Sequence, residues 1–183
     1  GRMEIVGCTR ENFPLIEDST RRVMQALEDH VVNEHYLFGT RPSLAEISIY
    51  GQFSQLGVDP TAQAMMRADY PYTFRWMLHA DDMSGIEGEW DAADSSFKPV
   101  VEALMAEFGR VYVPFLLANE AAAEAGEDTF SIEVDGLPYS QGTFKYQLKC
   151  LRELRNRYGK LDADTRAKVD PILVQNNCLE FLQ

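Results

Sequence analysis

The stretch FGTRPSLAEISIYGQFSQLGVDP, residues Phe38 to Pro60, decides the fold predicted for this chain. Within it, Ser43 is followed three residues later by Glu46 and then by an apolar run. This spacing is typical of a capping box, in which the serine hydroxyl accepts a backbone N–H at the start of a helix and the carboxylate accepts the serine N–H. The spacing therefore predicts a helix up to Leu56, with Ser43 and Glu46 as its structural N-cap.

Apolar residues occupy every side of this predicted helix, and no Lys or Arg occurs in the 25 residues from Pro42 to Met66. A helix that is apolar all round is typical of a protein interior. We therefore expect this helix to be the buried centre of the fold, and we explain the missing basic residues by the absence of water around it. Gly51, in the middle of the helix, then indicates that another helix approaches its backbone closely.

Apolar periodicity and capping residues predict further helices on both sides of this stretch. We expect an amphipathic surface helix from Asn12 to Glu34, and short helices that begin at Asp59-Pro60 and at Tyr70-Pro71. The segment from Asp81 to Asp94 contains six acidic residues and no basic one, which is typical of a solvated connection. This acidic segment is the candidate boundary between two parts of the chain.

The two predicted parts are a helical core at 12–80 and a helical extension at 95–183, packed together as one unit. In the extension we expect one helix that ends at Gly109 and a second with Pro114 in its first turn. Alternating apolar residues then surround Asp135-Gly136, a dipeptide that favours a type I′ turn, so one short β-hairpin is expected. Two more helices follow it. The predicted fold class is all-α, a helical bundle with one hairpin in its extension.

Composition and charge exclude several classes of protein. A formal net charge of −12 at pH 7 opposes binding to nucleic acid, because that affinity comes mainly from Lys and Arg. No apolar run approaches the roughly 20 residues of a membrane-spanning helix, so we expect a soluble protein without a membrane partner. Three widely spaced cysteines, Cys8, Cys150 and Cys178, and the lack of a signal-peptide pattern favour a cytoplasmic protein with reduced thiols.

Residues 36–56, YLFGTRPSLAEISIYGQFSQL, resemble the motif of the glutathione S-transferase C-terminal domain, which has an apolar-Gly turn, Ser or Thr, two residues, Asp and then a buried helix. The preceding helix and the later Tyr70-Pro71 and Trp76 fit the same order, so the resemblance covers about Asn12 to Leu78. Glu46 departs from the usual Asp but fits the general capping box equally well. More weakly, the stretches GRVYVPFLLAN and YSQGTFKYQLKCL resemble the extended C-terminal region of some bacterial transferase-like proteins of this family.

The resemblance implies a function that is divided between two domains. In this family the thiolate of glutathione attacks, adds to or reduces an electrophile. This chain would supply the apolar wall for a small hydrophobic electrophile, whereas an N-terminal thioredoxin-like domain would bind the co-substrate glutathione and hold the Tyr, Ser or Cys that activates its thiol. We therefore expect these residues to be the C-terminal part of a longer chain, inactive alone and compatible with a homodimer. The alternative is a non-catalytic protein-interaction or assembly module of the same fold.

Candidate residues for chemistry are few. His30, His35 and His79 lack the spacing of metal ligands, so neither a metal site nor a catalytic residue is predicted. A basic stretch near residues 145–157 either complements a helix dipole or attracts an acidic ligand or the N-terminal domain; its members are Lys145, Lys149, Arg152, Arg155 and Arg157. Six residues with apolar bodies or polar tips are candidates for lining a small-molecule pocket, with core packing as the alternative; they are Tyr112, Phe115, Asn119, Tyr139, Gln141 and Tyr146.

Overall fold

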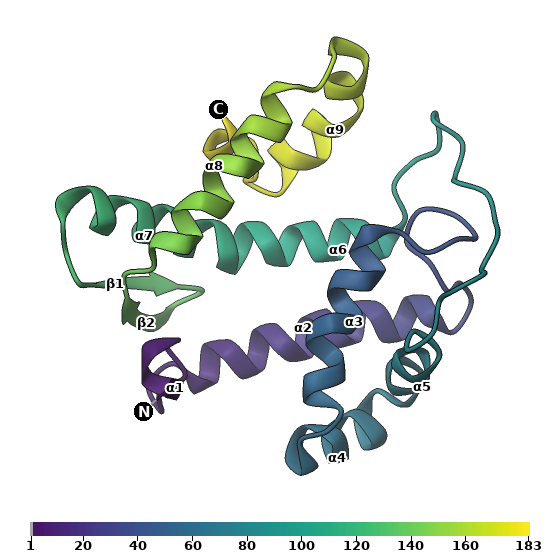
Figure 1. Cartoon of the computed structure of the whole chain (residues 1–183), viewed down its shortest axis with the longest axis horizontal. Helices are drawn as coiled ribbons and strands as arrows, with labels where there is room; N and C mark the ends of the chain where they lie inside the picture. The colour runs from purple at the N-terminus through teal and green to yellow at the C-terminus, as the bar shows by residue number, and fades with distance from the viewer. Residues whose placement is uncertain (1) are drawn as a thin grey trace. The chain divides into compact units, whose positions relative to one another are not determined.

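A computed structural model describes residues 2–183, apart from the side chains of Arg2 and Ile5. The chain is mostly helical, with one small antiparallel sheet of two strands (Figure 1). The elements are, in chain order, α1 (Arg2–Ile5), α2 (Phe13–Val31), α3 (Leu44–Leu56), α4 (Pro60–Asp69), α5 (Pro71–His79), α6 (Pro99–Glu107), η1 (Phe108–Tyr112), α7 (Val113–Ala125), β1 (Thr129–Val134), β2 (Leu137–Gly142), α8 (Lys145–Gly159), α9 (Ala163–Gln175) and η2 (Glu180–Leu182).

The chain divides into two compact units. Unit 1 comprises Gly1–Arg21 and Leu104–Gln183, and unit 2 comprises Arg22–Ala103. The boundaries fall within α2 and α6, and they differ from the two parts expected from the sequence because N-terminal residues belong with the hairpin. The Asn12 side chain donates to the carbonyl oxygens of Gly7 and Ser140, at 2.6 and 2.8 Å, and accepts the Ser140 N–H at 3.1 Å.

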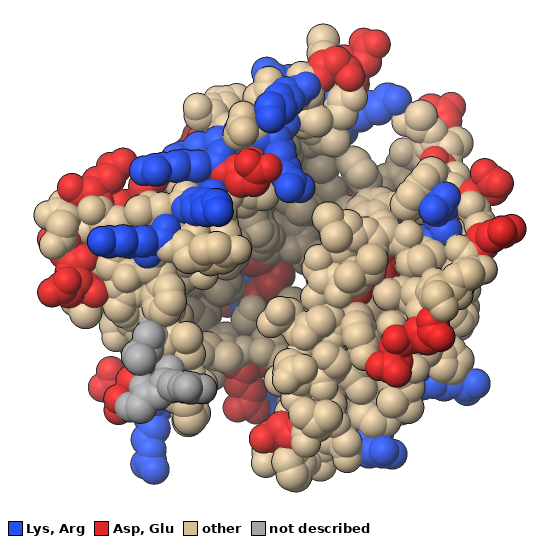
Figure 2. Space-filling model, in the orientation of Figure 1, with Lys and Arg blue, Asp and Glu red and all other residues tan. Residues whose placement is uncertain are grey.

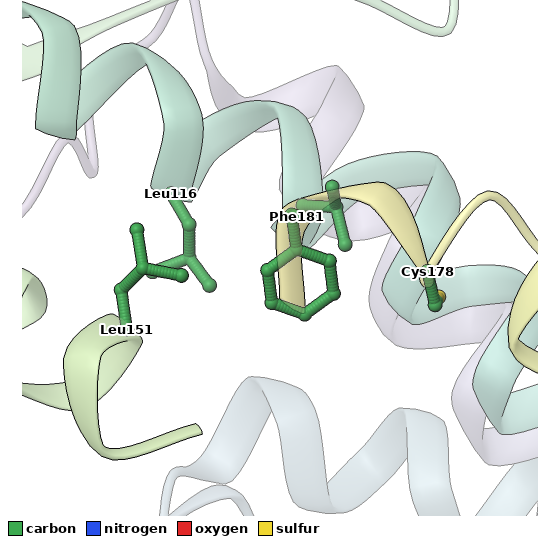
Figure 3. Packing of buried hydrophobic residues seen from close by; sticks show 5 residues of the cluster. Leu116, Leu151, Cys178 and Phe181 are labelled. Carbon is green, nitrogen blue, oxygen red and sulfur yellow. The ribbon is translucent and has the colours of Figure 1, made fainter. Parts of the chain in front are cut away.

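The core of unit 1 lies between α7, α8 and the C-terminal residues. Leu116 of α7 and Leu151 of α8 point toward each other, and Cys178 and Phe181 belong to the same buried cluster (Figure 3). Beside this cluster, Arg155 of α8 forms a two-pronged ion pair with Glu120 of α7, at 2.5 and 2.9 Å, and donates to the Phe181 carbonyl. This inward-facing cation of the basic stretch therefore fastens α8 to α7.

The helix end expected at Gly109 is wrong, because α6, η1 and α7 follow one another as a single helical run. The middle piece, η1, is a π turn, in which the Val113 N–H donates to the Phe108 carbonyl five residues back. Pro114 accounts for it, since proline has no N–H and its ring clashes with the carbonyl four residues back in a regular α turn. Gly109 has a different role, because a Cβ there would lie 1.7 Å from the Asn176 carbonyl oxygen.

The predicted capping box at the start of α3 is confirmed. Ser43 accepts the Ala45 N–H at 3.0 Å, and the Glu46 carboxylate accepts the Ser43 N–H at 2.7 Å. The same carboxylate also accepts the Leu37 N–H at 2.5 Å, although the side chain of Glu46 is only 1% exposed. One buried carboxylate therefore holds both the helix start and the chain that leads into it.

Other local predictions are also confirmed. Asp59 and Asp162 accept backbone N–H groups at the starts of α4 and α9. At the tip of the hairpin, Asp135 and Gly136 both have positive φ angles, as a type I′ turn requires. These features depend on residues within a few positions of one another, so the sequence specifies them directly.

The expected burial of α3 is wrong. Within α3 only Glu46 and Phe53 are buried, whereas Leu44 is 69% and Ile47 is 53% exposed. A Cβ added at Gly51 would meet no atom of the described residues within 4 Å, so none of their helices approaches the backbone there. An apolar pattern on every side does not say which side has a neighbour, and here α3 packs against α5 through only part of its surface. The exposed side of α3 is therefore an uncharged surface in contact with water.

The amphipathic helix α2 has a buried face. Leu15, Met24 and Leu27 are buried, whereas Ile16 is 36% exposed. Glu28 is also buried, and its carboxylate accepts two N–H groups at the start of α5, those of Tyr72 at 3.0 Å and Thr73 at 2.7 Å. Because the first N–H groups of a helix have no partner within it, this carboxylate stabilises α5 as Glu46 stabilises α3.

Candidate functional site

Unit 1 contains a cavity of about 310 Å³, which we call the α2–hairpin cavity. Residues from the first half of α2, the π turn, α7, the hairpin and α8 line it. None of these lining residues is charged, and their polar groups are hydroxyls and one amide. The lining residues are Leu15, Ile16, Ser19, Thr20, Val111, Tyr112, Phe115, Val134, Tyr139 and Gln147.

Aromatic rings form one wall of the α2–hairpin cavity. The rings of Tyr112 and Phe115, three residues apart along the helical run, are stacked with their centroids 5.6 Å apart and their planes at 24°. Tyr139 of the hairpin meets Phe115 edge to face, with the planes at 87° and the centroids 6.0 Å apart. A rigid aromatic wall of this kind suits a small apolar or aromatic molecule.

The two phenols of the wall are held by hydrogen bonds. The Tyr112 hydroxyl donates to the Gln147 side-chain oxygen at 3.1 Å, and the Tyr139 hydroxyl donates to the Gln141 side-chain oxygen at 2.6 Å. Burial raises the pKa of both phenols above the ordinary value of 10, and a neighbouring thiol, of Cys150 for Tyr112 and of Cys8 for Tyr139, adds to that shift. Both phenols are therefore neutral near pH 7. They can orient a ligand, but they do not supply a phenolate for attack or for taking up a proton.

The structure brings together three of the six candidate pocket residues, Tyr112, Phe115 and Tyr139. Gln141 lies behind them as the acceptor of the Tyr139 hydroxyl. Asn119 is fully buried elsewhere, where its amide donates to the Phe144 carbonyl at 3.0 Å and accepts the Phe144 N–H at 2.7 Å, so it fixes the start of α8. Tyr146 does not line the cavity and is 69% exposed.

Sequence reasoning missed the lining residues that α2 and α8 contribute. Ser19 and Thr20 of α2 lie side by side in the sequence, and Thr20 falls within the apolar repeat of an amphipathic helix. The hydroxyl of Thr20 within the apolar repeat was the one sequence feature that indicated a cavity beside this helix, because a fully packed helix face would favour Leu or Val at that position. Gln147 gave no comparable signal. Its role depends on Tyr112, which is 35 residues away in the chain.

A second hollow, of about 320 Å³, lies in unit 2 beside Trp76 and two histidines. The rings of His35 and His79 are stacked there, with centroids 6.5 Å apart, and the Trp76 indole N–H donates to the His35 carbonyl. His30 lies elsewhere, with Nε2 3.1 Å from the Tyr36 carbonyl oxygen, and burial lowers its pKa below 6.5. Among the residues that the structure describes, no three His, Cys, Asp or Glu side chains are grouped as metal ligands.

Comparisons of this chain with models of protein families, with curated proteins and with solved structures find no match. No helix within residues 2–183 combines the length and the apolar character needed to cross a membrane. Function is therefore inferred from the α2–hairpin cavity and from the capping motif of α3.

Proposed function

We propose that this chain is the hydrophobic-cosubstrate-side domain of a glutathione S-transferase-like protein. In that reaction the thiolate of glutathione forms a sulfur–carbon bond with an electrophile, and either a leaving group departs or a double bond takes up the thiolate and then a proton. The α2–hairpin cavity holds the electrophile. A thioredoxin-like domain outside these residues binds glutathione and contains the residue that activates its thiol.

The observation that carries this proposal is the uncharged cavity with its aromatic wall. A neutral apolar electrophile gains from leaving water for such a site, since burial of apolar surface is favourable by about 25 cal/mol per Å². We assign the orientation of a polar substituent of the electrophile to the lining residues Ser19 and Tyr139, which both carry hydroxyl groups. The family part of the proposal is supported by the resemblance of residues 36–56, whose capping box forms as predicted.

The protonation of the lining residues supports a role of this cavity in binding the electrophile, with activation of the glutathione thiol assigned to another domain. Glutathione must lose its thiol proton before it attacks, and that step needs a nearby group that stabilises a thiolate. Both Tyr112 and Tyr139 have raised pKa values, and none of the lining residues is a cation. The cavity is therefore suited to binding the electrophile and not to activating the thiol.

Binding of a neutral naphthalene fluorophore to the 183-residue chain tests the cavity. We expect saturable binding that Ser19→Phe weakens about tenfold or more, because the added ring fills the cavity. Ser48→Phe, on the exposed side of α3, is the matched control and should bind the probe as the unchanged chain does. Equal binding by the two variants would show that the cavity is not the site. Glutathione conjugation of an aryl halide by this chain alone is expected to be absent, and clear turnover would contradict the division of labour.

The second candidate function is a non-catalytic interaction module of the same fold. It is favoured by the exposed apolar side chains of α3 and the turn after it, where Leu44 is 69%, Ile47 is 53% and Val58 is 76% exposed. The open reading frame that encodes the chain discriminates between the two functions. An upstream thioredoxin-like segment with a cis-Pro turn and a Tyr, Ser or Cys near its first helix favours the enzyme.

A further inference from the structure

Helix α8 carries a row of exposed cations, which we call the α8 stripe. Lys145, Lys149 and Arg152 follow one another at intervals of four and three residues, and this spacing places them on one face of a helix. The buried residues of α8, Leu151 and Tyr158, lie on a different face. In the space-filling view, Lys and Arg side chains gather over the region that α8 occupies (Figure 2). None of the three stripe residues forms an ion pair with another described residue.

The α8 stripe is not explained by the needs of the helix itself. The other two cations of the basic stretch have partners, since Arg155 pairs with Glu120 and Arg157 pairs with Glu153. Lys145 and Lys149 lie in the first half of α8, where positive charge opposes the helix dipole. Complementing the dipole therefore does not account for them. An anionic surface laid across the stripe would remove this unfavourable interaction.

The same chain carries a surface with the complementary charge, the acidic segment Asp81–Asp94. Glu87, Glu89 and Asp94 are exposed in this segment, and none of them forms an ion pair with a described residue. Backbone hydrogen bonds hold the middle of the segment in place, because Glu89 O accepts the Thr40 N–H and Asp91 N–H donates to Phe38 O, each at 2.9 Å. These hydrogen bonds fix the backbone on both sides of Trp90.

The spacing of the two surfaces is compatible. Glu87 and Glu89 are two residues apart, and residues two apart in an extended chain are about 7 Å apart on one side of it. Residues three or four apart on a helix are separated by about 4.5 to 6 Å along the axis, and long Lys and Arg side chains bridge the difference. Each surface also presents an exposed aromatic residue, Trp90 at 52% and Tyr146 at 69%. Trp, Tyr and Arg are enriched among the few residues that contribute most of the binding energy at protein interfaces.

We propose that the α8 stripe of one copy of this chain docks on the acidic segment of a second copy. Lys149 and Arg152 pair with Glu87 and Glu89 across the contact, and Tyr146 and Trp90 pack at its edge. The contact joins two different surfaces, the α8 stripe of one copy and the acidic segment of the other. This self-association does not depend on the proposed transferase function.

Sedimentation velocity with charge-reversed variants tests the contact. The stripe variant is Lys149→Glu with Arg152→Glu, and the segment variant is Glu87→Lys with Glu89→Lys. The unchanged chain is expected to associate at low salt, with an association constant that falls about tenfold when ionic strength rises from about 0.05 to 0.5 M. Each variant alone is expected to be monomeric. An equimolar mixture of the two variants should associate again, because the stripe of each meets opposite charge on the other.

Two controls separate a specific contact from general charge effects. The segment variant adds four positive charges to a chain of net charge −12, so a loss of association runs against what reduced general repulsion would cause. Arg75→Glu with Lys168→Glu makes the same change as the stripe variant at exposed cations away from α8, and it should leave association unchanged. A monomeric unchanged chain at low salt, association of either variant alone, or a mixture that stays monomeric would each overturn the proposal. A variant that had merely misfolded would not be restored by mixing.

Discussion

Removal of the Glu46 carboxylate is expected to be among the most damaging single changes in unit 2. Glu46→Ala takes the acceptor from the Leu37 N–H, at 2.5 Å, and from the Ser43 N–H, at 2.7 Å. The Ser43 hydroxyl, 2.5 Å from the same carboxylate, also loses its acceptor. Water does not easily replace these contacts, because the Glu46 side chain is only 1% exposed.

The expected cost follows from the number of donors left without an acceptor. A buried N–H that loses its partner costs about 1 to 3 kcal/mol, so the two backbone donors together give about 4 kcal/mol for Glu46→Ala. Glu46→Gln keeps one carbonyl oxygen and should cost about half as much. Ser43→Ala removes the capping hydroxyl alone, for which about 0.5 to 2 kcal/mol is typical. Against a total stability of roughly 5 to 15 kcal/mol, the differences between these variants are measurable.

Urea unfolding followed by circular dichroism measures this order. Leu44→Ala is the matched control, because Leu44 lies in the same turn but is 69% exposed and should change the free energy of unfolding by less than about 0.5 kcal/mol. The slope of the free energy against urea should be equal in all four variants if only stability changes. If Glu46→Ala proves no more destabilised than Leu44→Ala, the carboxylate does not hold the helix start and the reasoning is refuted.

Three further predictions concern glycines, thiols and pH. Gly51→Ala should raise the free energy of unfolding in urea by about 0.5 to 1 kcal/mol, because the site is helical and open. Gly109→Ala should lower the free energy of unfolding by more than that, because the added Cβ would overlap the Asn176 carbonyl. Changes of the opposite sign would contradict both assignments. Cys178 is fully buried, and burial raises the pKa of its thiol to about 11. An aromatic disulfide reagent should therefore modify Cys8 and Cys150 in the native chain, and Cys178 only on unfolding. Equal modification rates for all three cysteines would exclude the burial of Cys178. Burial lowers the pKa of His30 below 6.5 in the folded chain, so as the pH falls His30 is protonated in the unfolded chain before it is protonated in the folded one. The free energy of unfolding should therefore decrease as the pH drops below about 6.5. A decrease of equal size in His30→Gln would show that other groups cause it.

Local chemistry accounts for what the sequence predicted well. Ser43, Asp59 and Asp162 each cap a helix as expected, and Asp135-Gly136 forms the expected turn, because these features depend on neighbours in the chain. The burial of α3 was predicted wrongly for the opposite reason. Whether a helix face is covered depends on distant segments, and an apolar pattern without a polar side does not point to any of them.

The residues of the candidate site could likewise be predicted only where they are close together in the sequence. Tyr112 and Phe115 are close in the sequence and share a wall of the cavity, so one segment predicted both. Ser19 and Gln147 reach the same cavity from other helices, and no local pattern connects them with that wall. Asn119 was predicted as a pocket residue because its polar tip suits a ligand, yet the tip is used to fix the start of α8.

The bond between the Asn12 side chain and Ser140 bears on how the protein is made. Its two partners are 128 positions apart, and all of unit 2 is encoded between the two segments of unit 1. During synthesis unit 2 emerges complete and can fold while the ribosome is still producing the hairpin. Asn12, just before α2, must wait for a partner that is translated more than a hundred codons later. We therefore expect unit 1 to complete its folding after unit 2. In nascent chains that end before the hairpin, the N-terminal segment should be more accessible to chaperones than residues 22–103.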